Sequence, residues 1–200
     1  SAVYSYMYAI LIKVSFPAGE AAIATSAEYS YFYAMLIKEP FPAGEPAIAT
    51  SAEWSYEYAS WLDQPFPAGE EAIANDDSYR LFYTRNILKH HRSPSWENLI
   101  KNNPKSSYEY ATILNQPFPA GEAAIATSAE HSFNYANDML KNKTFPAGEP
   151  AIATDAKYSY LYATDILKHK PFPAGEAAIA TDPHYARLYD QMLGTNLSQQ

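Results

Sequence analysis

Two residue types that can do chemistry recur at one period along the chain, a glutamate and a tyrosine. The glutamate is the fifth residue of the string Phe-Pro-Ala-Gly-Glu or of its worn copy. The seven glutamates are Glu20, Glu45, Glu70, Glu97, Glu122, Glu149 and Glu176. The eight tyrosines are Tyr8, Tyr33, Tyr58, Tyr83, Tyr110, Tyr135, Tyr162 and Tyr189.

The glutamate row has two interpretations. A ladder of carboxylates binds cations or a basic partner. Alternatively, each carboxylate accepts a hydrogen bond from a tyrosine hydroxyl or a backbone N–H of the adjacent unit, because a buried tyrosine hydroxyl needs a partner. We favour the structural interpretation because the two rows share a period. It predicts that Glu122→Ala destabilises the fold by roughly 1–3 kcal/mol.

Other signs of chemistry are weak. The chain has no cysteine, and its histidines form no pair spaced four residues apart on a helix. Glycine occurs almost only within Phe-Pro-Ala-Gly-Glu, so no phosphate-binding loop is expected. We therefore predict no catalytic residue, no metal site, no cofactor and no enzyme activity.

One region breaks the repetition. Between Arg80 and Lys105 the chain has six basic residues and one acid, Glu97. The residues proposed to bind a partner here are Arg85, Lys89, His90, His91, Arg92 and Trp96. Three of them, Arg85, Lys89 and Arg92, share roughly one face if the helix extends that far. A drifted unit with a solvated charged face is the alternative, which we favour.

A second candidate surface is the residue just before the recurring tyrosine. Its chemical type changes from unit to unit, which packing would not tolerate, so we predict a solvent-facing strip. Its members are Met7, Phe32, Glu57, Phe82, Glu109, Asn134, Leu161 and Leu188.

The elements that position these residues form a tandem array. Phe-Pro-Ala-Gly-Glu starts at residues 16, 41, 66, 118, 145 and 172, and residues 93–100 align as a worn copy. The chain therefore reads as one repeat domain, 1–200, with seven units beginning near 16, 41, 66, 93, 118, 145 and 172. A half-unit, 1–15, precedes them, and 195–200 is a tail.

Each unit is predicted to form two helices. The first starts at the proline, which is favoured at the first helical position. The second starts at a capping Ser, Asp or Asn such as Ser26, or one residue earlier as a capping box. Ser30 and Ala34 are a small pair that lets the next helix approach closely. The prediction is an all-α fold, an α-solenoid of seven helix pairs plus one leading helix, fifteen helices in all.

These units resemble a short tandem repeat of uncharacterised proteins from tailed bacteriophages, other large DNA viruses and some bacteria. The resemblance rests on residues 157–168, Lys-Tyr-Ser-Tyr-Leu-Tyr-Ala-Thr-Asp-Ile-Leu-Lys, followed by Phe-Pro-Ala-Gly-Glu at 172–176. Here serine replaces the first alanine of the repeat pattern, and the glycine before the basic loop residue is missing. The resemblance implies helical repeats and a viral origin, but no activity.

Composition narrows the function classes. The net charge is −8, so binding of the whole chain to nucleic acid is not expected. No apolar run is long enough to span a membrane, and no secretion signal is visible. We expect a cytoplasmic or virion-associated protein.

The leading hypothesis is a non-catalytic scaffold or protein-binding module, because repetition without a catalytic constellation favours binding. The first alternative is a self-assembling structural subunit of a filament or virion appendage. It rests on the last unit, where only Arg187 and Asp190 add polarity, since uncapped ends invite stacking. The second alternative is an acidic decoy of a nucleic-acid-binding protein, which the central basic stretch disfavours.

Overall fold

The computed structural model describes residues 1–89 and 91–199. This part of the chain is all-α, with fifteen α-helices, short 3₁₀ and π-helical segments and no strand. The predicted helix pairs and the leading helix are confirmed. The chain divides into two compact halves, an N-terminal half, Ser1–Leu99, and a C-terminal half, Ile100–Gln200. A single repeat domain stays a prediction.

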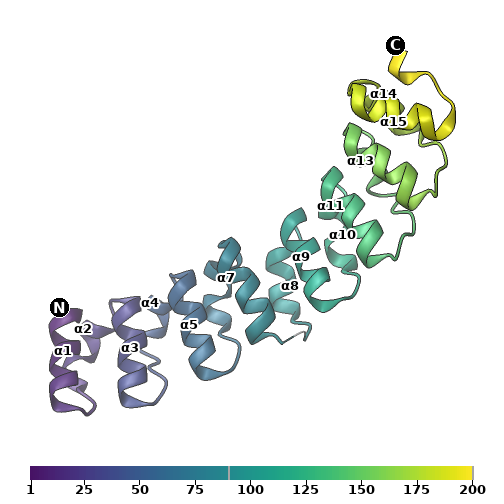
Figure 1. Cartoon of the computed structure of the whole chain (residues 1–200). Helices are drawn as coiled ribbons and strands as arrows, with labels where there is room; N and C mark the ends of the chain where they lie inside the picture. The colour runs from purple at the N-terminus through teal and green to yellow at the C-terminus, as the bar shows by residue number, and fades with distance from the viewer. Residues whose placement is uncertain (90, 200) are drawn as a thin grey trace. The chain divides into compact units, whose positions relative to one another are not determined.

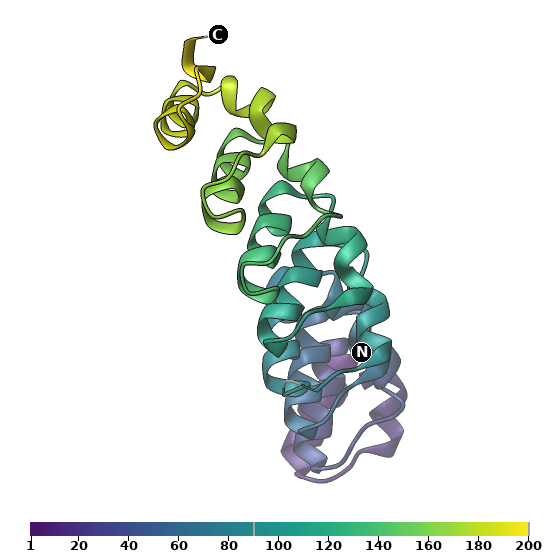
Figure 2. The same ribbon diagram turned by 90° about the vertical axis from the view of Figure 1, so that its right-hand side faces the viewer.

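The N-terminal half contains two rows of helices (Figures 1 and 2). The longer helices pack side by side and are α1 (Ala2–Ile12), α3 (Ala27–Ile37), α5 (Ala52–Leu62) and α7 (Asp77–Phe82), which continues as the π-helical segment η2 (Tyr83–Ile87). The shorter helices are α2 (Pro17–Ile23), α4 (Glu45–Ile48), α6 (Glu70–Ala74), which follows the 3₁₀ turn η1 (Pro67–Gly69), and α8 (Pro94–Ile100). Helices α2, α4 and α6 each pack mainly on the long helix that precedes them.

The C-terminal half repeats this arrangement. Its long helices are α9 (Pro104–Leu114), α11 (Ala129–Asn134) continued by η4 (Tyr135–Met139), α13 (Ala156–Leu161) continued by η5 (Tyr162–Ile166), and α15 (Pro183–Leu193). Its short helices are α10 (Glu122–Ile125) after η3 (Pro119–Gly121), α12 (Glu149–Ile152), and α14 (Glu176–Ala180) after η6 (Pro173–Gly175). A last 3₁₀ turn, η7 (Leu197–Gln199), packs on α15 and α14.

Capping side chains set where the long helices begin. Ser26, Ser51, Asp76, Asn103, Ser128, Asp155 and Asp182 each accept a hydrogen bond from a backbone N–H in the first turn. These bonds satisfy N–H groups that have no partner within the helix. The capping box one residue earlier is wrong, because the Thr25 hydroxyl donates back to the Ala22 carbonyl instead.

Unit length decides how a long helix ends. Where successive Phe-Pro-Ala-Gly-Glu copies lie 25 residues apart, the helix stays α-helical and stops at one left-handed residue, such as Lys38 or Asp63. Where they lie 27 apart, the last turn is π-helical. In the C-terminal half two left-handed residues follow each such turn. They are Lys141 and Asn142 in one repeat unit and Lys168 and His169 in the next. Of the two extra residues of a 27-residue unit, one lies in the wider π-helical turn and the other in the loop after the long helix.

Candidate protein-binding surface

The recurring tyrosine and glutamate meet, and the backbone of a phenylalanine joins them. The Tyr33 hydroxyl donates to Glu20 Oε1 at 2.8 Å and accepts from the Phe16 N–H at 2.7 Å. The same two bonds form at Tyr58, Tyr83, Tyr135, Tyr162 and Tyr189, at 2.7–3.0 Å to the glutamate and 2.8–3.2 Å to the phenylalanine N–H. We call this arrangement the Tyr–Glu–Phe brace.

The brace confirms the predicted hydrogen bond from tyrosine to glutamate but corrects its placement. Glu20 and Tyr33 belong to the same unit, whereas the prediction put the donor in the adjacent one. The contact between units is made by the ring, because Tyr33 packs against Phe41 of the next unit with centroids 4.9 Å apart. One side chain therefore ties its own helix pair together by its hydroxyl and the next pair by its ring.

Burial changes the acidity of the brace tyrosines. It raises the pKa of Tyr58 and of Tyr189 to about 12; a backbone N–H partly offsets this effect and the nearby glutamate adds to it. The pKa of Tyr83 and of Tyr162 is also raised, again mainly by burial. These hydroxyls stay protonated at neutral pH, which suits a donor in a structural bond.

Small residues hold the units close together, as the sequence predicted. Ser30 is fully buried, and its hydroxyl donates to the Ile23 carbonyl at 3.2 Å. A Cβ on Gly44 of the next unit would lie 2.5 Å from both Cβ and Oγ of Ser30. The same approach recurs at Gly69, Gly121, Gly148 and Gly175. This glycine is therefore required by the distance between units rather than by its backbone angles.

Aromatic rings connect successive long helices. The aromatic two residues before the recurring tyrosine contacts the aromatic, or His131, four residues before the recurring tyrosine of the next helix. The six pairs are Tyr6–Tyr29, Tyr31–Trp54, Tyr56–Tyr79, Tyr108–His131, Phe133–Tyr158 and Tyr160–Tyr185, with ring centroids 5.5–5.9 Å apart. We call this series the aromatic ladder.

The predicted variable strip is only partly open. Met7 and Phe82 are exposed, whereas Phe32, Glu57, Glu109, Asn134, Leu161 and Leu188 are half-buried. Phe32 lies among ladder rings, with its centroid 5.4 Å from that of Trp54. A continuous binding strip stays a prediction.

The basic region differs from the prediction in two ways. The helical segment η2 ends at Ile87 and Lys89 adopts a left-handed backbone, so Arg85, Lys89 and Arg92 do not share one helix face. Trp96 is fully buried and is not part of a surface patch.

The remaining candidates of this region lie at the surface. Arg85 and His91 are exposed. Lys89 forms an ion pair with Asp63 at 2.5 Å, and Arg92 with Glu97 at 3.4 Å. His90 lies outside the described residues. Partner binding by this region stays a prediction.

Trp96 has a structural explanation. It aligns with the glycine of Phe-Pro-Ala-Gly-Glu, Ser93 aligns with the phenylalanine, and Arg80 aligns with the buried serine. The Trp96 ring lies 5.0 Å from that of Tyr83, where other units have phenylalanine. Arg80 is also buried and pairs with Asp77 at 2.9 Å. In this unit Trp96 and Arg80 thus stand in for the glycine, the buried serine and the phenylalanine of the other units.

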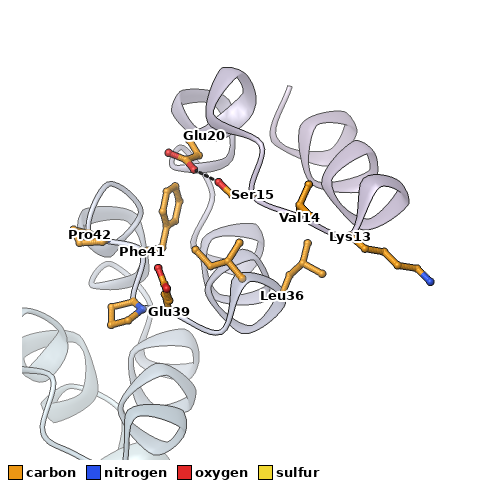
Figure 3. A pocket seen from close by; sticks show the side chains of 10 residues that line it. Lys13, Val14, Ser15, Glu20, Leu36, Glu39, Phe41 and Pro42 are labelled. Carbon is orange, nitrogen blue, oxygen red and sulfur yellow. Dashed lines mark hydrogen bonds between the residues drawn. The ribbon is translucent and has the colours of Figure 1, made fainter.

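A groove of about 510 Å³ opens between the corner after α1 and the corner after α3 (Figure 3). Glu20, Glu39 and Phe41 line it, and Lys13 projects away from the two carboxylates. The Ser15 hydroxyl donates to Glu20 at 3.3 Å, as Figure 3 shows. Glu20 already accepts a hydrogen bond from Tyr33 in the brace, so we assign this groove a structural role.

The largest exposed apolar surface lies on α1. Tyr4, Met7, Tyr8 and Leu11 are 76, 54, 50 and 80% exposed, and Val3, Ile10 and Ile12 are also exposed. The equivalent of Tyr8 is fully buried or nearly so in every other long helix. We call the exposed side formed by Tyr4, Ser5, Tyr8 and Leu11 the α1 face.

The last long helix is treated differently. Asp190 stands where the other long helices have a buried alanine or threonine, and it accepts four hydrogen bonds from the tail. The donors are the hydroxyls of Thr195 and Ser198 and the N–H groups of Leu197 and Ser198. The tail therefore packs where a further unit would begin. The expectation of an uncapped end is wrong for this side.

The sequence contained a signal for this cap. Leu197 follows Tyr189 by eight residues, the spacing that separates Phe41 from Tyr33. The tail is thus a shortened first segment of a unit with leucine in place of phenylalanine.

Comparisons with protein-family models, curated proteins and solved structures find no match to this sequence. The resemblance to the phage-type repeat thus stays a prediction. Across residues 1–89 and 91–199 no three metal-ligating side chains gather to form a site. In the same residues no helix is long and apolar enough to cross a bilayer.

Proposed function

We propose that this chain is a non-catalytic helical-repeat module that binds another protein. The observation that carries the proposal is the α1 face, because a contiguous exposed apolar surface marks a site of protein interaction. The recurring polar groups support it as well. The brace and the serine bonds already use the tyrosine, glutamate and serine side chains to hold the repeat together.

A displayed library of peptides and small domains, selected against the immobilised chain, tests this proposal. Clones enriched on the wild type should lose binding to Leu11→Glu, which puts a charge on the α1 face. Met35→Glu is the matched control, because Met35 is an exposed apolar residue of α3. Clones indifferent to Leu11→Glu, or an absence of enrichment, would contradict the proposal. Turnover of a substrate that one substitution abolishes would contradict its non-catalytic part.

Self-assembly is the second candidate, and the α1 face favours it because a second copy would also cover apolar surface. It predicts that the mass measured by light scattering grows with concentration. Leu11→Glu should abolish that growth and Met35→Glu should not. The tail bound to Asp190 weighs against head-to-tail assembly, because it occupies the place of the next unit.

A further inference from the structure

A row of partly exposed rings on the long helices of the N-terminal half contains one carboxylate. The residue before the brace tyrosine is Phe32 in α3, Glu57 in α5 and Phe82 in α7. These three helices pack side by side, and α3 and α5 have a long helix on each side (Figure 1). Phe82 is 46% exposed, and Phe32 and Glu57 are half-buried. We call these three residues the Phe–Glu–Phe row.

The two phenylalanines of the row pack on the aromatic ladder. Phe32 lies on Tyr6 with ring centroids 6.1 Å apart, and Phe82 lies on Tyr56 with centroids 5.9 Å apart. Phe82 also meets Tyr79 at 6.3 Å, so three rings contact one another on α5 and α7. The face of an aromatic ring is electron-rich and attracts a cation that lies over it. The row therefore presents surface suited to a positive charge.

Glu57 occupies a position where α3 and α7 have a ring, and its charge acts on both sides. The pKa of Tyr31, in the preceding long helix, is raised by burial and further by the charge of Glu57. The pKa of Tyr79, in the following long helix, is raised by burial and further by charges that include Glu53 and Glu57. A half-buried carboxylate among apolar rings has lost part of its hydration, which a bound cation compensates.

The two glutamates of α5 have no counter-ion. Among residues 1–89 and 91–199, no hydrogen bond or ion pair involves the carboxylate of Glu53 or of Glu57. They lie four residues apart on one helix face, where like charges repel. Helices α3 and α5 contain one further glutamate, Glu28, and no basic residue. The face thus carries an uncompensated negative charge beside aromatic rings, and its complement is a basic ligand.

We propose that this face binds a basic segment of another protein, with an arginine side chain over Glu57 between Phe32 and Phe82. A second arginine lies beside Glu53, one helical turn away. Arginine fits because its planar guanidinium stacks on aromatic rings and donates two parallel hydrogen bonds to a carboxylate. The site is separate from the α1 face and goes beyond the proposed function, because it assigns a ligand chemistry to a second surface.

The first experiment titrates the full chain with the acetylated and amidated peptide Ala-Arg-Ala-Ala-Ala-Arg-Ala. The control peptide has citrulline in place of both arginines, which keeps their shape and removes their charge. Trp54 reports on binding by its fluorescence, because its ring lies 5.4 Å from that of Phe32. The arginine peptide should give a saturable change and the citrulline peptide none. Raising the salt from about 20 mM to about 500 mM should weaken binding by about tenfold, because the contact is electrostatic and exposed.

Variants of the chain test the assigned residues. Glu57→Gln keeps the size of the side chain and should weaken binding of the arginine peptide by about tenfold, the loss of a charged hydrogen bond. Phe82→Leu should weaken it by about threefold, because it removes an exposed contact between ring and cation. Glu71→Gln is the matched control, since Glu71 is an exposed glutamate of the short helix α6, and it should leave binding unchanged. Thermal melting checks that each variant folds.

Peptides with one arginine replaced at a time assign the two contacts. One single-citrulline peptide should lose nothing further with Glu57→Gln, and the other nothing further with Glu53→Gln, because each pair of changes removes the same interaction. A peptide with lysine in place of both arginines should bind more weakly, because ammonium neither stacks nor forms two parallel bonds. Additive losses in every combination, equal binding of the citrulline peptide, or unchanged binding by Glu57→Gln would overturn the proposal. Equal binding of the lysine peptide would overturn the assignment of arginine.

The outcomes separate this inference from the proposed function. Leu11→Glu alters the α1 face and should leave binding of the arginine peptide unchanged. If the arginine peptide fails to bind while library clones depend on Leu11, the inference fails and the proposed function stands. If peptide binding depends on Glu57 and no clone depends on Leu11, the inference stands and the role of the α1 face fails. If the unaltered chain grows in mass with concentration and Glu57→Gln abolishes that growth, the occupant is a second copy and the inference is overturned.

Discussion

Helices α1 and α15 occupy the same position of the repeat, yet their surroundings differ. In α15 the Tyr189 hydroxyl forms the complete brace with Glu176 and Phe172, and Asp190 binds a tail. In α1 the Tyr8 residue is 50% exposed, and a cleft of about 350 Å³ adjoins it. The difference teaches that the hydroxyl of the recurring tyrosine is bonded where a short helix of the repeat precedes its long helix, and open where none does.

The largest expected effect concerns the close approach of glycine. Gly175→Ala should destabilise the chain by about 3 kcal/mol, because the new Cβ would lie 2.5 Å from Oγ and 2.6 Å from Cβ of Ser159, which is fully buried. A Cβ on Gly19 would lie 2.3 Å from the Phe16 ring and 3.0 Å from Cβ of Ser5. Gly19→Ala should still cost less, because Phe16 and Ser5 are partly exposed and can shift, whereas Ser159 is fully buried. Urea denaturation measures both. Equal losses would show that α1 packs as tightly as the later helices.

The next effect comes from the same substitution at the two helices. Tyr189→Phe should destabilise the fold by about 1–3 kcal/mol, because it leaves Glu176 and the Phe172 N–H without their partner. Tyr8→Phe should change the unfolding free energy by less than about 0.5 kcal/mol, as expected away from such networks. Matched urea titrations decide it. A large loss at Tyr8 would mean that its hydroxyl already has a partner.

Alkali should weaken the braced helices. Burial raises the pKa of Tyr58 and Tyr189 to about 12, whereas an unfolded tyrosine titrates near pH 10. A raised folded pKa gives stability that is complete below about pH 10 and lost as the pH rises toward 12. Helix loss and tyrosinate absorbance, followed together, should coincide for these groups. Tyrosinate formation by all tyrosines near pH 10 with the helices intact would contradict the brace.

The smallest effect is local to the tail. Burial acts to raise the pKa of Asp190, but the donors of Ser198, Thr195 and Leu197 outweigh it and hold that pKa well below its usual range. Its contribution is therefore present above about pH 4 and lost as the pH falls further.

Hydrogen exchange of the Leu197 and Ser198 amides measures this effect. Protection should fall progressively as the pH drops below about 4, and it should be lost at all pH values in Asp190→Ala. Asp165→Ala is the control, because Asp165 is exposed and outside the tail. Unchanged protection in Asp190→Ala would show that the aspartate does not hold the tail.

Much of this architecture follows from the sequence because the repeat shows each local signal several times. The capping residues, the prolines after phenylalanine and the small pair at Ser30 and Ala34 gave the helix pairs and their close packing. The bond between tyrosine and glutamate was also predictable. Its placement within a unit was not, because a shared period does not say which of two identical neighbours a side chain faces.

The ends and the drifted unit were harder to predict. Asp190 looked like stray polarity, since the spacing between Tyr189 and Leu197 gains meaning only when the tail is seen as a shortened unit. Trp96 looked like part of a surface patch because basic residues flank it. Its burial accompanies changes at Arg80 and Ser93, where other units have a buried serine and a phenylalanine. The exposure of α1 was predictable, because the leading half-unit lacks the first helix of its pair.

The π-helical turn has a consequence for how such an array changes over evolution. A unit gains two residues and still forms every bond of its brace, as Tyr135 and Tyr162 show beside Tyr33 and Tyr58. The corner after the long helix absorbs the insertion, so length changes there are separated from the contacts that hold neighbours together. Selection is thus free to lengthen and diversify these corners one at a time while the stacking rules stay unchanged.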